Sequence, residues 1–161
     1  MKRMSALLLV LCLLGGVALA ETADAMTTAS VYNYYGKLEG DELMNAINST
    51  KGFYAIASVN QDGTPNIAFF IFSCVKLEDS YYLQLGINPN QTTANIGNGS
   101  ELMAIFAPCP AEDAQYPYPV TGARMYLRKV TDETVNAELL KSAPAGYAPM
   151  YYEISEIIPL G

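Results

Sequence analysis

The run from residue 67 to residue 75 constrains the fold most, because it carries apolar side chains on both faces of an extended chain. In a strand, alternate side chains point to opposite faces. Phe69, Ile71, Ser73 and Val75 share one face here, and Phe70, Phe72 and Cys74 share the other. Both faces of such a strand have to be covered. We therefore expect a core on one side and a helix or a second subunit on the other.

The surrounding segments predict a mainly β chain. Residues 53–59 and 67–72 are rich in β-branched and aromatic residues, and Asp62-Gly63 lies between them. This pattern is typical of an antiparallel hairpin. Further strands are expected at residues 81–85, 102–106, 123–128 and 150–158. Short helices are expected at residues 41–47, around residues 94–96, and at residues 131–142, where Thr131 supplies the start signal.

The first twenty residues have the pattern of a secretory signal peptide. Lys2 and Arg3 supply a positive start, residues 6–17 are apolar, and Ala18-Leu19-Ala20 is a small-x-small cleavage site. The alternative is a membrane anchor, but the apolar stretch is shorter than the roughly 20 residues that a bilayer span needs. We expect export to the periplasm or the extracellular space, with no stable membrane insertion after cleavage.

Cleavage after Ala20 would leave 141 residues, and the loss of Lys2 and Arg3 would change the net charge from −7 to −9. Residues 21–30 are small and polar, which predicts a flexible leader. Residues 31–161 have the length of one domain. An acidic chain with scattered basic residues lacks the positive patch that nucleic acid or anionic lipid requires, so neither partner is expected.

Several kinds of chemistry are excluded by composition. The chain has no histidine, which rules out His-based acid–base catalysis and His ligation of zinc or haem. No metal-ligand spacing is visible, so no metal site is expected. Cys74 and Cys109 are the cysteines that remain after cleavage. In an exported chain they could form one disulfide or remain as two buried free thiols.

Three segments in order resemble the FMN-binding split-barrel family, the pyridoxamine-phosphate-oxidase-like proteins, and in particular its small single-domain members. They are YAIASVNQDGTPNIAFF, NQTTANIGNGSELMAIF and GARMYLRKVTDE. With the last strand they cover roughly residues 50–160. The resemblance implies a six-stranded antiparallel split β-barrel of the α+β class with a few short helices. It also implies a homodimer and FMN as the cofactor.

The resemblance places the flavin between the second strand and the loop at residues 86–95. Small residues let the backbone approach a ligand, and hydroxyls with free N–H groups at a helix start can hold a phosphate. Thr92 and Thr93 fit that role, although one of them could simply cap the short helix. The cofactor-binding residues expected from the resemblance are Phe69, Phe70, Ile71, Gln84, Gly86, Asn88, Gln91, Thr92, Thr93 and Asn95.

One departure from the family concerns the phosphate. Members that hold FMN usually place a Lys or Arg in or near this loop, whereas this chain has Gln91 and no basic residue between Lys76 and Arg124. Charge-assisted hydrogen bonds are roughly twice as strong as neutral ones. We therefore expect FMN to be held weakly unless Arg124, Arg128 or Lys129 reaches the site.

Three functions are compatible with these observations. The first is an exported flavoprotein with electron-transfer or FMN-dependent oxidoreductase activity, as the resemblance implies. The second is a protein of the same fold that binds another small aromatic or apolar ligand, and the third is a ligand-free structural dimer. A bound flavin would separate the first function from the other two.

Overall fold

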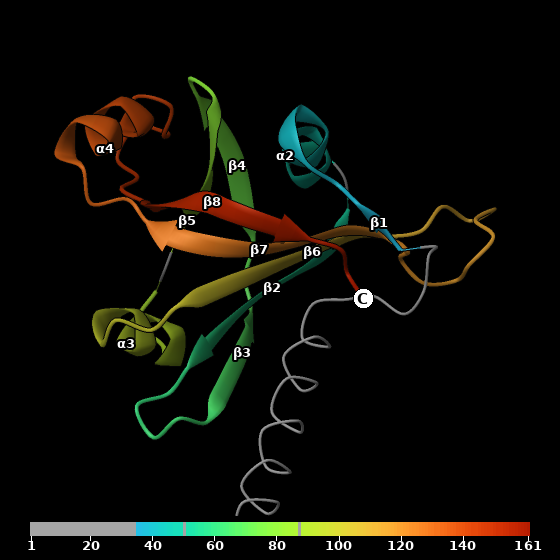
Figure 1. The fold of residues 1–161 in the computed structure, drawn as a ribbon. Coiled ribbons are helices and arrows are strands. Elements are labelled where there is room, and N and C mark those ends of the chain that lie inside the picture. The colour runs from blue at the N-terminus through green and yellow to red at the C-terminus, as the bar shows by residue number, and fades with distance from the viewer. Residues whose placement is uncertain (1–34, 50, 87) are drawn as a thin grey trace, which may run out of the picture. The chain divides into compact units, whose positions relative to one another are not determined.

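The computed structural model describes residues 35–49, 51–86 and 88–161. The signal peptide predicted at residues 1–20, the leader predicted at residues 21–30 and the start of the predicted domain lie outside the described residues. The described part is a mainly antiparallel β structure with three short helices (Figure 1). None of these helices has the length and apolar character needed to cross a membrane.

Eight strands and three helices follow one another along the described chain. The strands are β1 (Gly36–Lys37), β2 (Gly52–Val59), β3 (Pro65–Phe69), β4 (Phe72–Leu77), β5 (Ser80–Leu85), β6 (Leu102–Pro108), β7 (Thr121–Lys129) and β8 (Met150–Ile158). The helices are α2 (Gly40–Ser49), α3 (Gln91–Gly97) and α4 (Glu133–Leu140).

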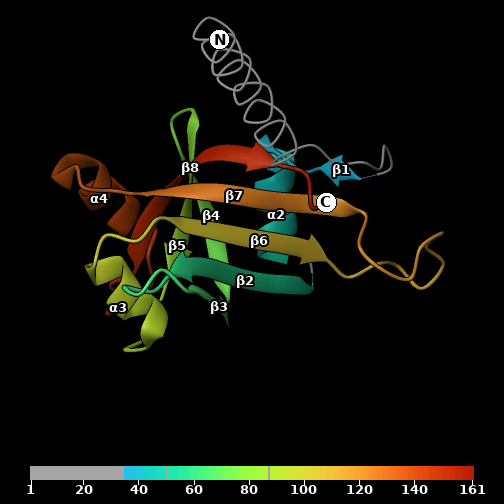
Figure 2. The same cartoon turned by 60° about the horizontal axis from the view of Figure 1, so that its bottom comes forward.

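All strands belong to one sheet with the order β3-β2-β6-β7-β8-β5-β4, and β1 pairs with β7 in parallel. The neighbours along this path are antiparallel, and Figure 2 shows β2, β6 and β7 side by side. The path is open, because β3 and β4 lie at its two ends. The described pairings do not close the sheet, so they do not confirm the six-stranded barrel. The mainly β antiparallel architecture agrees with the sequence prediction.

The strand count differs from the prediction because the expected second strand is broken at Phe70 and Ile71. Residues before the break pair with β2, and residues after it pair with β5. One continuous stretch of chain therefore supplies both ends of the sheet path. The two-residue strand β1 was not predicted.

The alternation of side chains survives the break. Phe70, Phe72 and Cys74 are buried in the main core, whereas Phe69 and Ile71 are 74% and 88% exposed. The predicted two-faced pattern is confirmed. One face of this stretch fills the core, and the other presents large apolar side chains at the surface.

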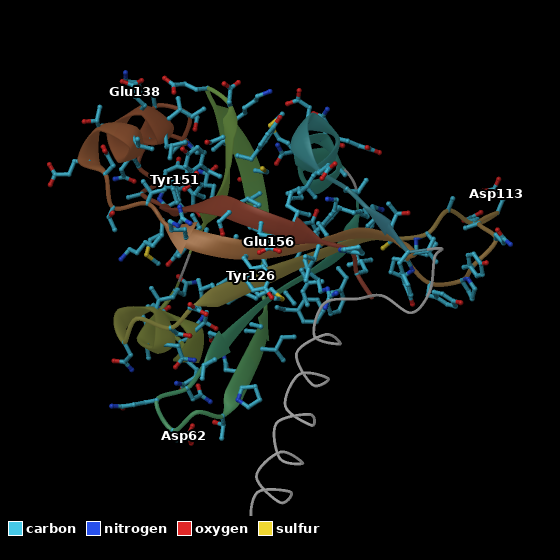
Figure 3. All side chains as sticks on the ribbon, viewed as in Figure 1. Asp62, Asp113, Tyr126, Glu138, Tyr151 and Glu156 are labelled. Carbon is cyan, nitrogen blue, oxygen red and sulfur yellow. The ribbon has the colours of Figure 1, made fainter. Side chains whose placement is uncertain are left out.

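Local signals explain the turn and helix boundaries. In the β2–β3 turn, an Asp62 carboxylate oxygen accepts hydrogen bonds from the backbone N–H of Thr64 at 3.0 Å and from its hydroxyl at 2.6 Å. Gly63 adopts a φ of 83° there, which suits glycine. Figure 3 shows Asp62 at the tip of this hairpin. Helix α4 is capped by Asp132 and not by Thr131, since the Asp132 carboxylate accepts the first free backbone N–H groups.

Both described cysteines are free thiols. Cys74 lies on β4 inside the core, where burial raises the pKa of its thiol to about 12. Cys109 lies just after β6 and is exposed. Strands β4 and β6 are not neighbours in the sheet. The disulfide considered from the sequence is therefore not formed, and the alternative of two buried thiols holds only for Cys74.

Two adjacent buried tyrosines on β8 differ in the hydrogen bonding of their hydroxyl groups. Tyr151 donates a hydrogen bond to the carbonyl of Leu139 at 2.9 Å and joins α4 to the sheet (Figure 3). The Tyr152 hydroxyl is buried in the main core and has no partner among the described residues. Burial raises the pKa of Tyr152 to about 12.

The two tyrosines provide a matched test of this packing. Tyr151→Phe should lower the free energy of unfolding by about 1 kcal/mol, because it removes a net favourable hydrogen bond. Tyr152→Phe removes the same atom without removing a bond and should leave stability unchanged or slightly raised. Urea denaturation followed by circular dichroism measures both. Equal losses in the two variants would contradict the described hydrogen bonding.

Candidate functional site

A pocket of about 470 Å³ opens where the β3–β4 break meets the connection from β5 to α3. This volume is within the range of small-molecule sites. The lining residues are Phe69, Phe70, Ile71, Gly86, Asn88 and Asn90. Five of these six belong to the set of cofactor-binding residues expected from the sequence, and Asn90 is the addition.

One wall of the pocket is aromatic and apolar. Phe69 and Ile71 present their side chains to solvent, and Phe70 lies behind them in the core. The Phe53 ring packs edge-on against the Phe69 ring with centroids 4.5 Å apart, a geometry that aromatic pairs favour. This contact restrains the Phe69 ring. The wall can therefore offer a fixed flat surface to a ring-shaped ligand.

A second wall is polar and comes from the segment that leads into α3. Asn90 is the N-cap, because its side-chain oxygen accepts the backbone N–H of Thr93 at 3.0 Å. The Thr93 hydroxyl donates to the Asn88 carbonyl at 2.7 Å and lies 3.3 Å from the Asn90 side-chain oxygen. The cap is thus Asn90, and not Thr92 or Thr93 as one interpretation of the sequence allowed.

A buried polar network fixes α3 to the β2–β3 hairpin. The Asn95 amide donates to the Ser58 hydroxyl and to the Asn60 side-chain oxygen, both at 2.9 Å, and accepts from Gln91 at 2.9 Å. Asn95 is fully buried. Buried polar groups without partners are costly, so these bonds hold the helix in one position. Figure 1 shows α3 beside this hairpin.

Thr92 belongs to the same network and does not line the pocket. It is 1% exposed, and its hydroxyl accepts a hydrogen bond from the Asn66 amide at 3.1 Å. The Asn66 amide also donates to Ser58. Some of the residues expected to hold a ligand thus line the pocket, while Gln91, Thr92 and Asn95 hold α3 in position.

Gln84 and Gly86 have different surroundings, although both lie at the end of β5. Gln84 is buried, and its side-chain oxygen accepts a hydrogen bond from the Ser73 hydroxyl on β4 at 2.9 Å. At Gly86, an added Cβ would lie 2.0 Å from the Tyr147 hydroxyl. The glycine therefore allows the Tyr147 phenol to lie against the pocket rim. The sequence suggested a close approach by a ligand at this position.

No lining residue has a titratable side chain. The pocket walls can bind and orient a molecule, but they carry no general acid, general base or nucleophile of their own. Among the described residues, no group of three or more Cys, Asp or Glu residues is placed to hold a metal ion. Any redox chemistry at this pocket would have to come from the bound molecule.

A second pocket of about 430 Å³ lies in the β6–β7 connection, away from α3. Cys109 and the paired rings of Tyr116 and Tyr118, with centroids 5.6 Å apart, contribute to its lining. It shares no lining residue with the pocket at the β3–β4 break. The Asp113 side chain marks the outer end of this connection in Figure 3.

The sequence contained signals for two residues that the prediction missed. Asn90 stands three positions before Thr93, at the spacing of an N-cap side chain and the N–H it accepts, and Asn is among the preferred N-cap residues. Asn66 alternates with apolar residues in β3 and so faces the same side as Ser58. Nothing in the local pattern revealed that this side would be covered by α3.

Comparison with protein-family models gave no match, and a search of curated proteins also gave none. Solved structures with the same fold were found. An FMN-binding protein from Syntrophomonas wolfei subsp. wolfei matches with a TM-score of 0.50 and 13% identity, over 75% of this chain and 85% of that one. HupZ from Group A Streptococcus matches with a TM-score of 0.51 and 20% identity, over 76% and 94% of the two chains.

The fold is therefore that of the FMN-binding split-barrel proteins that the sequence resembled. At these identities the likeness concerns the fold alone. Unrelated functions share folds. The function of this chain has to be argued from its own pocket.

The buried network under the pocket can be tested with two asparagines that belong to α3 and its C-cap. Asn95→Ala should lower the free energy of unfolding by about 2 kcal/mol, because it leaves buried partners unpaired. Asn98→Ala is the control, since the Asn98 side chain is exposed and no described side-chain bond depends on it. Thermal and urea unfolding measure both. Indistinguishable stabilities would show that the network does not hold α3.

Proposed function

We propose that this protein binds a small flat molecule, in first place a flavin, in the pocket at the β3–β4 break. The observation that carries the proposal is the position of an aromatic wall and a polar wall on the two segments where the resembled family binds its cofactor. The proposed activity is ligand binding, with electron transfer or reduction of a second molecule by the flavin as its consequence. The alternatives are a non-flavin ligand of similar shape and a ligand-free structural dimer.

The ring portion of a flavin suits the residues present. Phe69 and Ile71 provide an exposed apolar surface, and the pocket volume of about 470 Å³ is large enough for a fused ring system. Asn88 provides an amide that both donates and accepts hydrogen bonds, and Asn90 provides an amide N–H donor. A neighbour of the same fold is described as FMN-binding, which supports a flavin. When bound, a flavin would supply the redox chemistry.

The phosphate portion of FMN does not suit these residues, because no lining residue is basic. The chain can hold the ring and its neutral polar groups, but the phosphate gains no cation from the pocket walls. The pocket therefore fits one part of this cofactor and not the other.

We further propose that the protein is a homodimer that covers the exposed face of β2 and β3. The register pairs Ala57 with Ile67 and Ala55 with Phe69, so the alternate residues of both strands share one face. The large apolar residues of this face are Phe53, Val59, Ile67, Phe69 and Ile71, and each is at least 46% exposed. A cluster of this kind is typical of an interaction surface. A second copy would also close one side of the pocket.

Export is part of the proposal and rests on the composition of residues 1–20. A chain that leaves the cell unfolded has to bind its ligand outside. Intact-mass measurement on protein from its native host tests this point. A mature chain that begins at Glu21 agrees with export and cleavage, and retention of Met1–Ala20 would contradict it.

Flavin binding can be tested with two exposed aliphatic residues, Ile71 and Leu140. Ile71→Ala removes part of the aromatic and apolar wall, and we expect at least a fivefold loss of riboflavin affinity. Leu140→Ala makes a similar truncation on α4, outside both the pocket and the exposed apolar face of β2 and β3, and should alter the affinity less than twofold. Quenching of flavin fluorescence gives both constants. Absence of any flavin binding by the unmodified protein would refute the proposal.

The dimer can be tested with a charge placed in the exposed patch. Ile67→Asp should shift the protein to a monomer, because an interface that buries this side chain would also have to bury a carboxylate. Leu140→Asp is the control, since Leu140 is an exposed apolar residue on α4, away from the patch. Sedimentation velocity across a dilution series measures both. A monomer at micromolar concentration without either substitution would contradict the dimer.

A further inference from the structure

We infer that the pocket recognises a flavin without recognising a phosphate, so that an uncharged flavin of the riboflavin class binds about as well as FMN. This inference rests on the proposed function, because it concerns the same pocket. It goes further in naming the part of the ligand that is recognised: the ring and its neutral polar groups. Three observations carry it, namely the positions of the basic residues, the state of the α3 N-terminus, and the neutrality of the polar wall.

Seven of the nine basic residues lie in the described part of the chain, and none of them lines the pocket. Five are engaged elsewhere: Lys37 with Glu39, Lys76 with Asp41, Arg124 with the Pro159 carbonyl, Arg128 with Glu153, and Lys141 with Glu138. Lys129 lines two other pockets. The three residues that could have reached the phosphate from β7, Arg124, Arg128 and Lys129, therefore all have other surroundings.

The remaining basic residue is Lys51, which stands just before β2. Its carbonyl accepts a hydrogen bond from the backbone N–H of Cys109 at 2.9 Å, and its side chain is not part of the pocket lining. Lys51 is nevertheless exposed. It is the basic residue whose removal tests the inference most strictly.

At the start of α3, the backbone N–H of Thr93 and the hydroxyls of Thr92 and Thr93 are engaged by the protein itself. Asn90 accepts the backbone N–H of Thr93, and the Thr93 hydroxyl is turned to Asn88 and Asn90. The Thr92 hydroxyl is buried against Asn66. The hydroxyl groups that the sequence offered for a phosphate are thus engaged in internal hydrogen bonds. A phosphate would have to displace the helix cap in order to use them.

The polar wall that remains is neutral. The Asn88 amide can donate and accept hydrogen bonds, and the Asn90 amide nitrogen can donate, since the Asn90 oxygen caps α3. These groups match the carbonyl and N–H groups of a flavin ring edge or the hydroxyls of its ribityl chain. A phosphate dianion offers acceptors only, and it meets a chain with a net charge of −7. These amides therefore recognise the neutral groups of a flavin, and the negative charge of the chain weakly repels the phosphate.

The direct test is a comparison of FMN and riboflavin by quenching of flavin fluorescence. We expect dissociation constants within about fivefold of one another, with the FMN constant above ~1 μM. Raising the salt concentration should leave riboflavin binding unchanged and should strengthen FMN binding slightly, since salt screens the repulsion of the dianion. FMN binding at least 100-fold tighter than riboflavin binding, or FMN binding that weakens steeply with salt, would overturn the inference while leaving the proposed flavin function intact.

Three variants locate the effect. Asn88→Lys adds a cation to the polar wall and should shift the ratio of the two dissociation constants at least fivefold in favour of FMN. Asn98→Lys adds the same charge at the other end of α3 and should change neither ligand more than twofold. Lys51→Gln should leave the ratio of the two constants unchanged.

The outcomes are distinct from those that test the proposed function. A selective loss of FMN affinity in Lys51→Gln would overturn the inference, because it would identify a phosphate partner. Equal gains in FMN affinity in Asn88→Lys and Asn98→Lys would also overturn it, because they would show that the net charge of the chain, and not a cation in the pocket, strengthens FMN binding. Failure of the unmodified protein to bind either flavin would instead refute the flavin function itself.

Discussion

The structure depends on one stretch of chain whose two faces are both apolar. Phe70, Phe72 and Cys74 fill the core, while Phe69 and Ile71 point outward. The break between β3 and β4 lets this stretch pair with β2 before it and with β5 after it, so it lies at both ends of the sheet path. The outward side chains at the break have no cover within the described chain. These exposed apolar side chains form part of both the pocket and the proposed dimer surface.

The pocket also requires that α3 is held in a fixed position, because the segment leading into α3 forms the polar wall. The α3 helix has only seven residues, and a helix of this length is marginal without tertiary support. That support comes from hydrogen bonds of Asn95 and Thr92 to the β2–β3 hairpin, beneath the helix. In the sequence, these polar groups suggested a ligand-binding loop. In the structure, they mainly hold the helix in position. What remains for a ligand is a neutral rim and an aromatic surface.

Much of the fold could be predicted from the sequence, because period-two patterns and turn residues report on local structure directly. The two-faced run at β3 and β4 was recognised, as was the Asp62-Gly63 hairpin. The break at Phe70 was not, since the alternation of side chains continues through it without a Gly or Pro. Five of the six residues that line the pocket were among those named from the sequence. The buried roles of Thr92 and Asn95 could not be, because a hydroxyl or an amide looks the same in sequence whether it faces a ligand or a neighbouring strand.

The central claim is that this pocket binds a ring without recognising a phosphate. The most direct measurement is identification of the ligand carried by the protein as isolated from its native host, by absorbance followed by extraction and mass spectrometry. We predict either an uncharged flavin or an empty pocket that takes up riboflavin when it is added. Stoichiometric FMN that survives purification and dialysis would contradict the claim.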